Sequence, residues 1–119
     1  MTTQQIAERL AELCRQGQYE TAQNELYADD AISIEAYASP DFEKETKGLK
    51  AIIEKGYKFD AMLEETHGTT VSEPLVTGNV IAFTLSLDMT MKGRERGSME
   101  ELCVYHVKDG KIVSEQFFM

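Results

Sequence analysis

The chain has 119 residues, of which 42% are apolar and 28% are charged, a composition typical of globular domains and unlike that of disordered or fibrous proteins. Its formal net charge of −9 gives a surface that repels phosphate backbones and anionic lipid, which argues against nucleic acid and membranes as partners. The length suffices for one hydrophobic core but not for two, so we expect a single domain spanning residues 1–119.

The N-terminal residues show no export signal. Met1–Gln5 lack the basic segment and the apolar run of a signal peptide, and no stretch of the chain is apolar over the length that crosses a bilayer. We therefore expect a cytoplasmic protein. Cys14 and Cys103 lie far apart in sequence without CxxC or zinc spacing, so they are interpreted as reduced thiols.

Two helices are predicted before the first strand. A helical apolar pattern that follows the capping-box residues Thr2 and Gln5 predicts a helix over about Thr3–Gln16. A second helical pattern covers Gln18–Ala28. The alternation of apolar and polar residues after it predicts a short strand over Ala31–Tyr37.

A polar loop and a third helix come next. The segment Ala38–Thr46 contains Pro40 and is predicted to be a loop. Apolar positions at helical spacing then mark an amphipathic helix, namely Leu49, Ile52, Ile53, Tyr57 and Leu63. Its charged residues are expected on the opposite, outward face, namely Lys50, Glu54, Lys55 and Lys58. Gly56 is interpreted as a site of close packing against a sheet.

The rest of the chain is predicted to be an antiparallel meander. Four β-type segments are separated by glycine-containing turns, and they cover Thr66–Val76, Val80–Met91, Ser98–Val107 and Lys111–Phe118. In the second segment apolar residues alternate with small or polar ones, so one face is apolar throughout. A flat strand of about 12 residues would be about 40 Å long, too long for a domain of this size. The sheet is therefore expected to curl into a cone with an interior.

Three short segments, taken in order, carry a family resemblance. They are Tyr27–Ala31 entering the first strand, Gly48–Ile52 opening the third helix, and Val107–Val113 at the last hairpin. Together they resemble the nuclear transport factor 2-like superfamily, which includes SnoaL-like polyketide cyclases and ketosteroid isomerases, over nearly the whole chain. The resemblance implies an α+β fold in which a cone-shaped, curved antiparallel sheet packs on three N-terminal helices, the cystatin-like roll.

The resemblance also implies a position for a catalytic base. In the ketosteroid isomerases a carboxylate a few residues beyond the segment that matches Tyr27–Ala31 shuttles the proton, and this register places Glu35 there. Those enzymes add an oxyanion hole made of a tyrosine and a protonated aspartate. This chain has Leu10 and Cys103 at the matching positions. The steroid reaction itself is therefore not expected.

Further polar residues are expected to face the interior. If the meander follows the superfamily, Glu101, Cys103 and Tyr105 share the inward face of their strand. The buried face of the last strand must hold either Glu115 or its polar neighbours. Carboxyl groups in an apolar interior have raised pKa values, which suits proton abstraction next to a carbonyl group. Two hypotheses follow: Glu35 is a base with Glu101 or Tyr105 as hydrogen-bond donor, or these carboxylates are rim and surface charges.

The histidines and the apolar residues complete the candidates. His67 is a candidate general acid at the mouth of the pocket, because imidazole titrates near neutral pH, and the alternative is a strand-end histidine without chemistry. His106 is expected to face away from the interior. Neither histidine has the spacing of a metal ligand set, so no metal and no cofactor are expected. The predicted pocket lining, or plain core, comprises Tyr57, Phe83, Leu87, Met89, Cys103, Glu115 and Phe117.

Two functions remain open at this point. In the first, the protein is a cofactor-independent isomerase or cyclase that binds a small hydrophobic molecule and uses a carboxylate base. In the second, it is a non-catalytic domain that binds such a ligand or dimerises. The small, mixed residues Thr84, Ser86 and Asp88 on the outer sheet face are compatible with a homodimer formed through that face.

Overall fold

Two helices open the chain and supply much of the buried apolar surface. The computed structural model describes residues 1–119, with α1 at Thr3–Arg15 and α2 at Tyr19–Leu26. The predicted capping box of α1 is confirmed, because Thr2 Oγ1 accepts from the Gln5 backbone N–H at 3.1 Å and the Gln5 side chain accepts from the Thr2 N–H at 2.8 Å. The face of α1 that is buried comprises Ile6, Ala7, Leu10, Ala11, Leu13 and Cys14.

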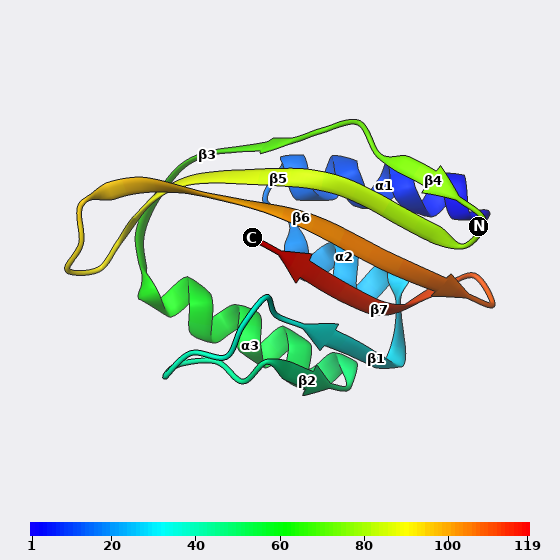
Figure 1. The fold of residues 1–119 in the computed structure, drawn as a ribbon, viewed down its shortest axis with the longest axis horizontal. Coiled ribbons are helices and arrows are strands. Elements are labelled where there is room, and N and C mark those ends of the chain that lie inside the picture. The colour runs from blue at the N-terminus through cyan, green and yellow to red at the C-terminus, as the bar shows by residue number, and fades with distance from the viewer.

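The third helix and seven strands follow in the order β1, β2, α3, β3, β4, β5, β6, β7. Their bounds are Tyr27–Ile34 for β1, Glu45–Lys47 for β2, Leu49–Met62 for α3, Leu63–Val71 for β3, Leu75–Thr77 for β4, Val80–Met91 for β5, Arg96–Lys108 for β6 and Lys111–Phe118 for β7. The strand order across the sheet is β2-β1-β7-β6-β5-β3, and β4 also pairs with β5 (Figure 1). All of these pairs are antiparallel except that of β1 with β7, which is parallel.

Several predicted boundaries differ from the structure. The second helix ends at Leu26, because the backbone at Tyr27 is already extended and pairs with β7. The predicted strand Ala31–Tyr37 therefore begins earlier and ends at Ile34. The two aspartates of that segment, which resemble a helix end in sequence, are exposed side chains of a strand. The predicted loop before α3 contains the short edge strand β2.

The predicted strand Thr66–Val76 is wrong as one continuous element. Pairing with β5 stops at Val71, and β4 resumes it only at Leu75. Pro74 lies in this break, where its missing N–H removes no ladder hydrogen bond. The close packing predicted at Gly56 is also wrong, since a Cβ atom added there would have no neighbour within 4 Å.

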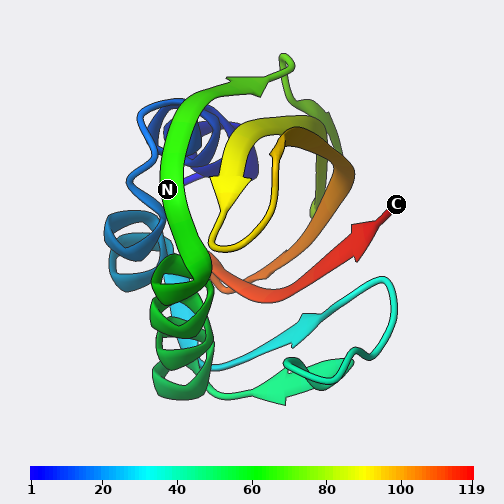
Figure 2. The same cartoon turned by 90° about the vertical axis from the view of Figure 1, so that its left-hand side faces the viewer.

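The sheet curls around an interior, as predicted. Figure 2 shows the strands curving around one side of the molecule while the three helices lie along the other. The inward face of β5 is apolar as expected, and its buried residues are Ile81, Phe83, Leu85 and Leu87. Beyond them the β5–β6 hairpin projects past the helices at one end of the molecule (Figure 1). The fold is thus the predicted α+β cone.

No helix of the protein combines the length and the apolar character needed to cross a membrane.

Candidate functional site

A cavity of about 880 Å³ lies between the helices and the concave face of the sheet. It is lined by 35 residues, of which 20 are hydrophobic, so its wall is mainly apolar. The lining comes from all three helices and from strands β1, β3, β5, β6 and β7. The volume falls within the range of about 300–1,000 Å³ found for small-molecule sites. The curl of the sheet therefore leaves room for a ligand.

Glu115 is the buried carboxyl group of the site. It lies on β7 opposite Ser33 of the parallel strand β1, and its side chain is only 4% exposed. Ser33 Oγ donates to Glu115 Oε2 at 2.6 Å, and the Tyr27 hydroxyl donates to the other oxygen. Burial raises the pKa of Glu115, and the two hydrogen bonds act in the opposite direction. Of the two possible faces of this strand, the one that carries Glu115 is turned inward.

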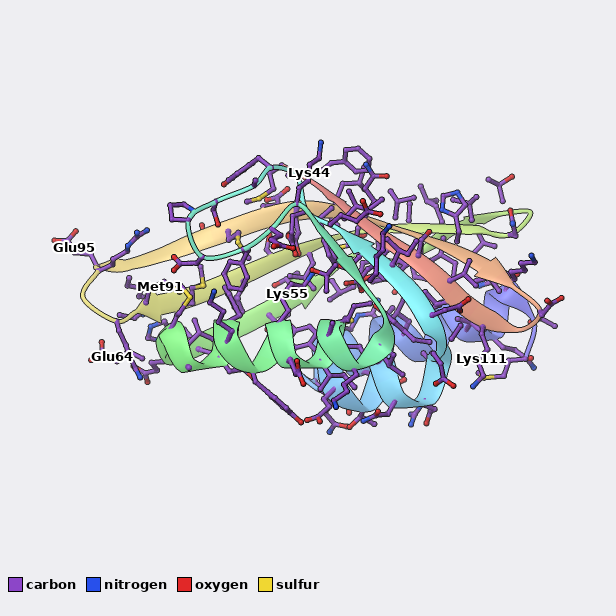
Figure 3. The ribbon with its side chains drawn as sticks, turned by 90° about the horizontal axis from the view of Figure 1, so that it is seen from below. Lys44, Lys55, Glu64, Met91, Glu95 and Lys111 are labelled. Carbon is purple, nitrogen blue, oxygen red and sulfur yellow. The ribbon has the colours of Figure 1, made fainter.

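Lys55 is the single cation of the cavity wall. Its Nζ donates to Ser33 Oγ at 2.6 Å and to Glu35 Oε1 at 2.7 Å, and it lies 6.0 Å from the centre of the Phe117 ring. Figure 3 shows Lys55 on the side of α3 that is turned toward the strands. Its predicted outward position is therefore wrong. The signal in the sequence is the spacing of three residues from the buried Ile52, which puts both side chains on one helix face.

Glu35 follows directly after β1 and lies at the edge of the cavity. Its backbone N–H donates to the Lys44 carbonyl at 2.7 Å, and this hydrogen bond fixes the backbone of Glu35 just beyond the end of β1. Its side chain is 28% exposed, and that of its partner Lys55 is 16% exposed. The predicted inward orientation of Glu35 is thus found together with an ion pair that the sequence did not indicate.

Glu101 is a half-buried carboxyl group of the cavity wall and has no ionic partner. It lies on β6 opposite Leu85, and Cys103 Sγ is 3.9 Å from its Oε1. Burial, together with the negative charges of Glu35 and Glu115, raises the pKa of Glu101 to about 7. Its proton is therefore gained and lost near neutral pH.

These groups form one connected arrangement. Lys55 joins Glu35 to Ser33, Ser33 joins Lys55 to Glu115, and Glu101 lies close enough for the charges of the other acids to act on it. An ammonium in a largely apolar wall can stabilise a developing oxyanion. A carboxyl group with a pKa near 7 can exchange a proton with a ligand. The arrangement can thus support acid–base chemistry on a carbonyl compound.

Most of the residues predicted from the sequence line the cavity. They are Glu35, Glu101, Tyr105, Tyr57, Leu87, Cys103, Glu115 and Phe117. Leu10 also lines it. The two cysteines are free and buried, in agreement with their interpretation as thiols. His106 is exposed on the outer face of β6, as expected.

Three of the candidate residues lie outside the cavity, in agreement with the alternatives of a strand-end histidine and plain core. His67 does not line the cavity, and its Nε2 lies 2.8 Å from Thr90 Oγ1 instead. Phe83 is buried beside Tyr105, with ring centres 5.3 Å apart, and contributes no cavity surface. Met89 packs against the core outside the cavity, toward the projecting hairpin. Side-chain alternation gives the correct face of β5 but not the part of that face over which the cavity extends.

Three residues of the site were missed, namely Tyr27, Ser33 and Lys55. Tyr27 was expected inside a helix, and Ser33 is one small polar residue in an alternating strand. Only the parallel pairing of β1 with β7 brings both to Glu115. No group of three or more histidine, cysteine, aspartate or glutamate side chains is placed to hold a metal ion.

Comparison with known proteins gives a consistent result. A family profile described as SnoaL-like domain matches residues 1–119. A Mesorhizobium loti protein assigned as a SnoaL-like polyketide cyclase is 35% identical, with 100% of each chain covered and a TM-score of 0.92. An NTF2-like protein of unknown function from Burkholderia pseudomallei is 13% identical, covering 100% of this chain and 92% of that one, with a TM-score of 0.79. A Xanthomonas campestris protein of unknown function with a cystatin-like fold is 20% identical, covering 99% and 90%, with a TM-score of 0.75. No curated protein matches the chain.

Proposed function

The chain belongs to the SnoaL-like domain family, and from this premise we propose that it binds a small, largely apolar carbonyl compound and moves a proton on it without a cofactor. The observation that carries the proposal is the position of Glu101 in the wall of an apolar cavity without an ionic partner, where burial raises its pKa to about 7. An acid–base catalyst works best when its pKa lies near the working pH. The polyketide cyclase assignment of the Mesorhizobium loti relative supports the same class of substrate.

Proton transfer in this cavity has two parts. The Glu101 carboxylate takes a proton from the carbon next to the carbonyl group, and the electron pair of that C–H bond forms a C=C bond while the carbonyl oxygen becomes an enolate. Lys55 Nζ donates a hydrogen bond to that oxygen and offsets its charge. Return of the proton to another carbon completes an isomerisation. Attack of the enolate carbon on a second carbonyl group forms a C–C bond and breaks the C=O π bond, and the alkoxide that results takes the proton back from Glu101, which completes a cyclisation.

Glu35 has a different part in this proposal from the one predicted. Its carboxylate is bound to Lys55 at 2.7 Å, so we assign to it the positioning of the ammonium. Glu101 has no such ionic partner and takes the role of the base. The assignment therefore moves the base from Glu35, just after β1, to Glu101 on β6, which the sequence suggested as a hydrogen-bond donor.

Hydrogen exchange tests the chemistry directly. We expect the protein to catalyse exchange of the hydrogens next to the carbonyl group of cyclic and polycyclic ketones in D₂O, followed by NMR, after ligands are selected by thermal shift. Glu101→Gln should lower the exchange rate by about 100-fold or more, the order that a general base contributes. Glu100→Gln is the matched control, since Glu100 is the neighbouring residue on the opposite face of β6. Full exchange in Glu101→Gln, with loss in Glu35→Gln, would return the base to Glu35.

A non-catalytic ligand-binding domain is the second candidate. The observation in its favour is that Glu35, Lys55, Ser33 and Glu115 satisfy one another within the protein, as they would in a purely structural network. Ligands that raise the melting temperature while no ketone exchanges its hydrogens would favour this second function.

We also propose that a second copy of the chain covers the outer face of the sheet. A row of exposed side chains crosses three strands there, where Thr84 pairs with Leu102 and Leu102 pairs with Phe118. Leu102 is 40% exposed and Phe118 is 45% exposed, which is unfavourable for an apolar surface in water. Burial of this row in a symmetric interface would remove it from solvent.

A further inference from the structure

The segment that joins β1 to β2 forms part of the cavity wall. We name residues 36–43 the β1–β2 loop. Four of its residues line the cavity, namely Ala36, Tyr37, Ser39 and Phe42. Figure 2 shows the loop leaving the end of β1 and returning to β2 on the side of the molecule away from α1 and α2. The Glu35 N–H donates to the Lys44 carbonyl at 2.7 Å, so the two ends of the loop are fixed to each other. The residues between them can therefore move as one unit.

The loop is ordered within itself but has little packing on the rest of the protein. The Ser39 N–H donates to the Phe42 carbonyl at 2.9 Å, and the Phe42 N–H donates to Ser39 Oγ at 3.1 Å. Neither Tyr37 nor Phe42 packs against the hydrophobic core, and Tyr37 is 63% exposed. Segments with few buried apolar contacts open locally at a low free-energy cost. The β1–β2 loop is therefore held in place only weakly by packing.

One lysine of α3 joins the loop to the helices. Lys58 Nζ donates to the Asp41 carbonyl and lies 5.1 Å from the centre of the Phe42 ring. The first of these contacts is the single hydrogen bond between residues 36–43 and another part of the protein. Lys58 is exposed and does not line the cavity. A change at Lys58 therefore acts on the loop without removing a side chain that a ligand in the cavity would contact.

Tyr37 connects the loop with ligand binding. Its side chain lines a mainly apolar cavity and leaves more than half of its surface in water, which the apolar body of a ligand would cover. We propose that the β1–β2 loop is a lid on the cavity, that Lys58 is its latch, and that an apolar ligand enters and leaves when this latch is broken. The inference goes beyond the proposed function, because it holds whether the ligand reacts or is only bound.

Limited proteolysis tests the latch without any ligand. Chymotrypsin cleaves after accessible aromatic residues, and the loop offers it Tyr37 and Phe42. Lys58→Met keeps the apolar stem of the side chain and removes the ammonium. We expect cleavage within the loop, followed by mass spectrometry, to become about tenfold faster, the order given by one charged hydrogen bond and one exposed cation–aromatic contact. Lys50→Met is the control, since Lys50 is an exposed lysine of α3 that does not line the cavity. Cleavage no faster than in this control overturns the inference.

Stopped-flow fluorescence tests the lid. The probe is prodan, a neutral naphthyl ketone whose emission shifts when it leaves water. The latch is the same in the free and the occupied protein, so Lys58→Met should raise the association and dissociation rate constants of prodan together, by about tenfold, and change its affinity by about twofold or less. Prodan should also slow cleavage of the loop in the unchanged protein. Unchanged rate constants, an altered affinity at an unchanged association rate, or no protection by prodan would each overturn the inference. Hydrogen exchange in Glu101→Gln is a separate measurement, so the proton-transfer proposal and this one can fail independently.

Discussion

Replacement of Lys55 by methionine tests the arrangement on which the site depends. The methionine keeps the length and the apolar stem of the side chain but removes the ammonium, which donates to Ser33 at 2.6 Å and to Glu35 at 2.7 Å. The side chains of Lys55 and Glu35 are 16% and 28% exposed, so solvent screens their attraction only in part. Hydrogen bonds to charged groups contribute about 1.5–3 kcal/mol each to stability. The apolar methionine side chain can still pack on the Phe117 ring, which offsets part of the loss. We expect a loss of about 2–3 kcal/mol in the free energy of unfolding.

The same variant has a second, independent effect. The charge of Lys55 lowers the pKa of Glu101, so its removal should raise that pKa above about 7. Urea denaturation measures the loss of stability, and carboxyl ¹³C NMR over a pH series measures the titration of Glu101. Lys50→Met is the control, because Lys50 is exposed on the same helix. A loss no greater than that of the control, or an unshifted Glu101 titration, would refute the network.

Three further predictions concern the same structure. Because the pKa of Glu101 is about 7 when folded against 4.5 ordinarily, this group favours folding below about pH 4.5 and that contribution is lost as the pH rises through about 7. Urea denaturation should therefore find Glu101→Gln more stable than the unchanged protein at about pH 8 but not at about pH 4, and equal stability at both would contradict the raised pKa. Ser33→Ala should cost about 1–2 kcal/mol and raise the pKa of Glu115 further, with the exposed Ser98→Ala as the control, because Ser33 donates to that carboxyl group. Phe118→Glu should convert the proposed dimer to a monomer in sedimentation velocity, and an unchanged sedimenting mass would exclude this face as the interface.

The sequence predicted the fold well wherever periodicity was strong. The alternation along β5 predicted its buried face, and the helical spacing in α1 predicted both its cap and its core residues. The inward orientation of Glu101 followed from the same alternation together with the family resemblance. These patterns are local, so they are visible without knowledge of the tertiary structure.

The site was predicted less completely, because its connections are made between distant segments. Lys55 shares a helix face with the buried Ile52. A lysine side chain is nevertheless expected to extend into solvent, and only the tertiary structure reveals that Glu35 lies where it can pair with the ammonium group. Tyr27 follows a helical pattern but adopts an extended backbone, since pairing with β7 outweighs local propensity. Phe83 and Leu87 share one face of β5, and only the position of the helices decides which of them borders the cavity.

The parallel pairing of β1 with β7 has a consequence for biosynthesis. Ser33 and Glu115 are 82 residues apart in sequence, and β7 follows every other helix and strand of the fold in chain order. A nascent polypeptide that still lacks β7 has neither Glu115 nor the strand that orders Ser33 and Tyr27. Such long-range closure is slow compared with helix formation. The contacts of Glu115 with Ser33 and Tyr27 therefore form only after β7 has been synthesised, and a variant truncated before β7 cannot make them.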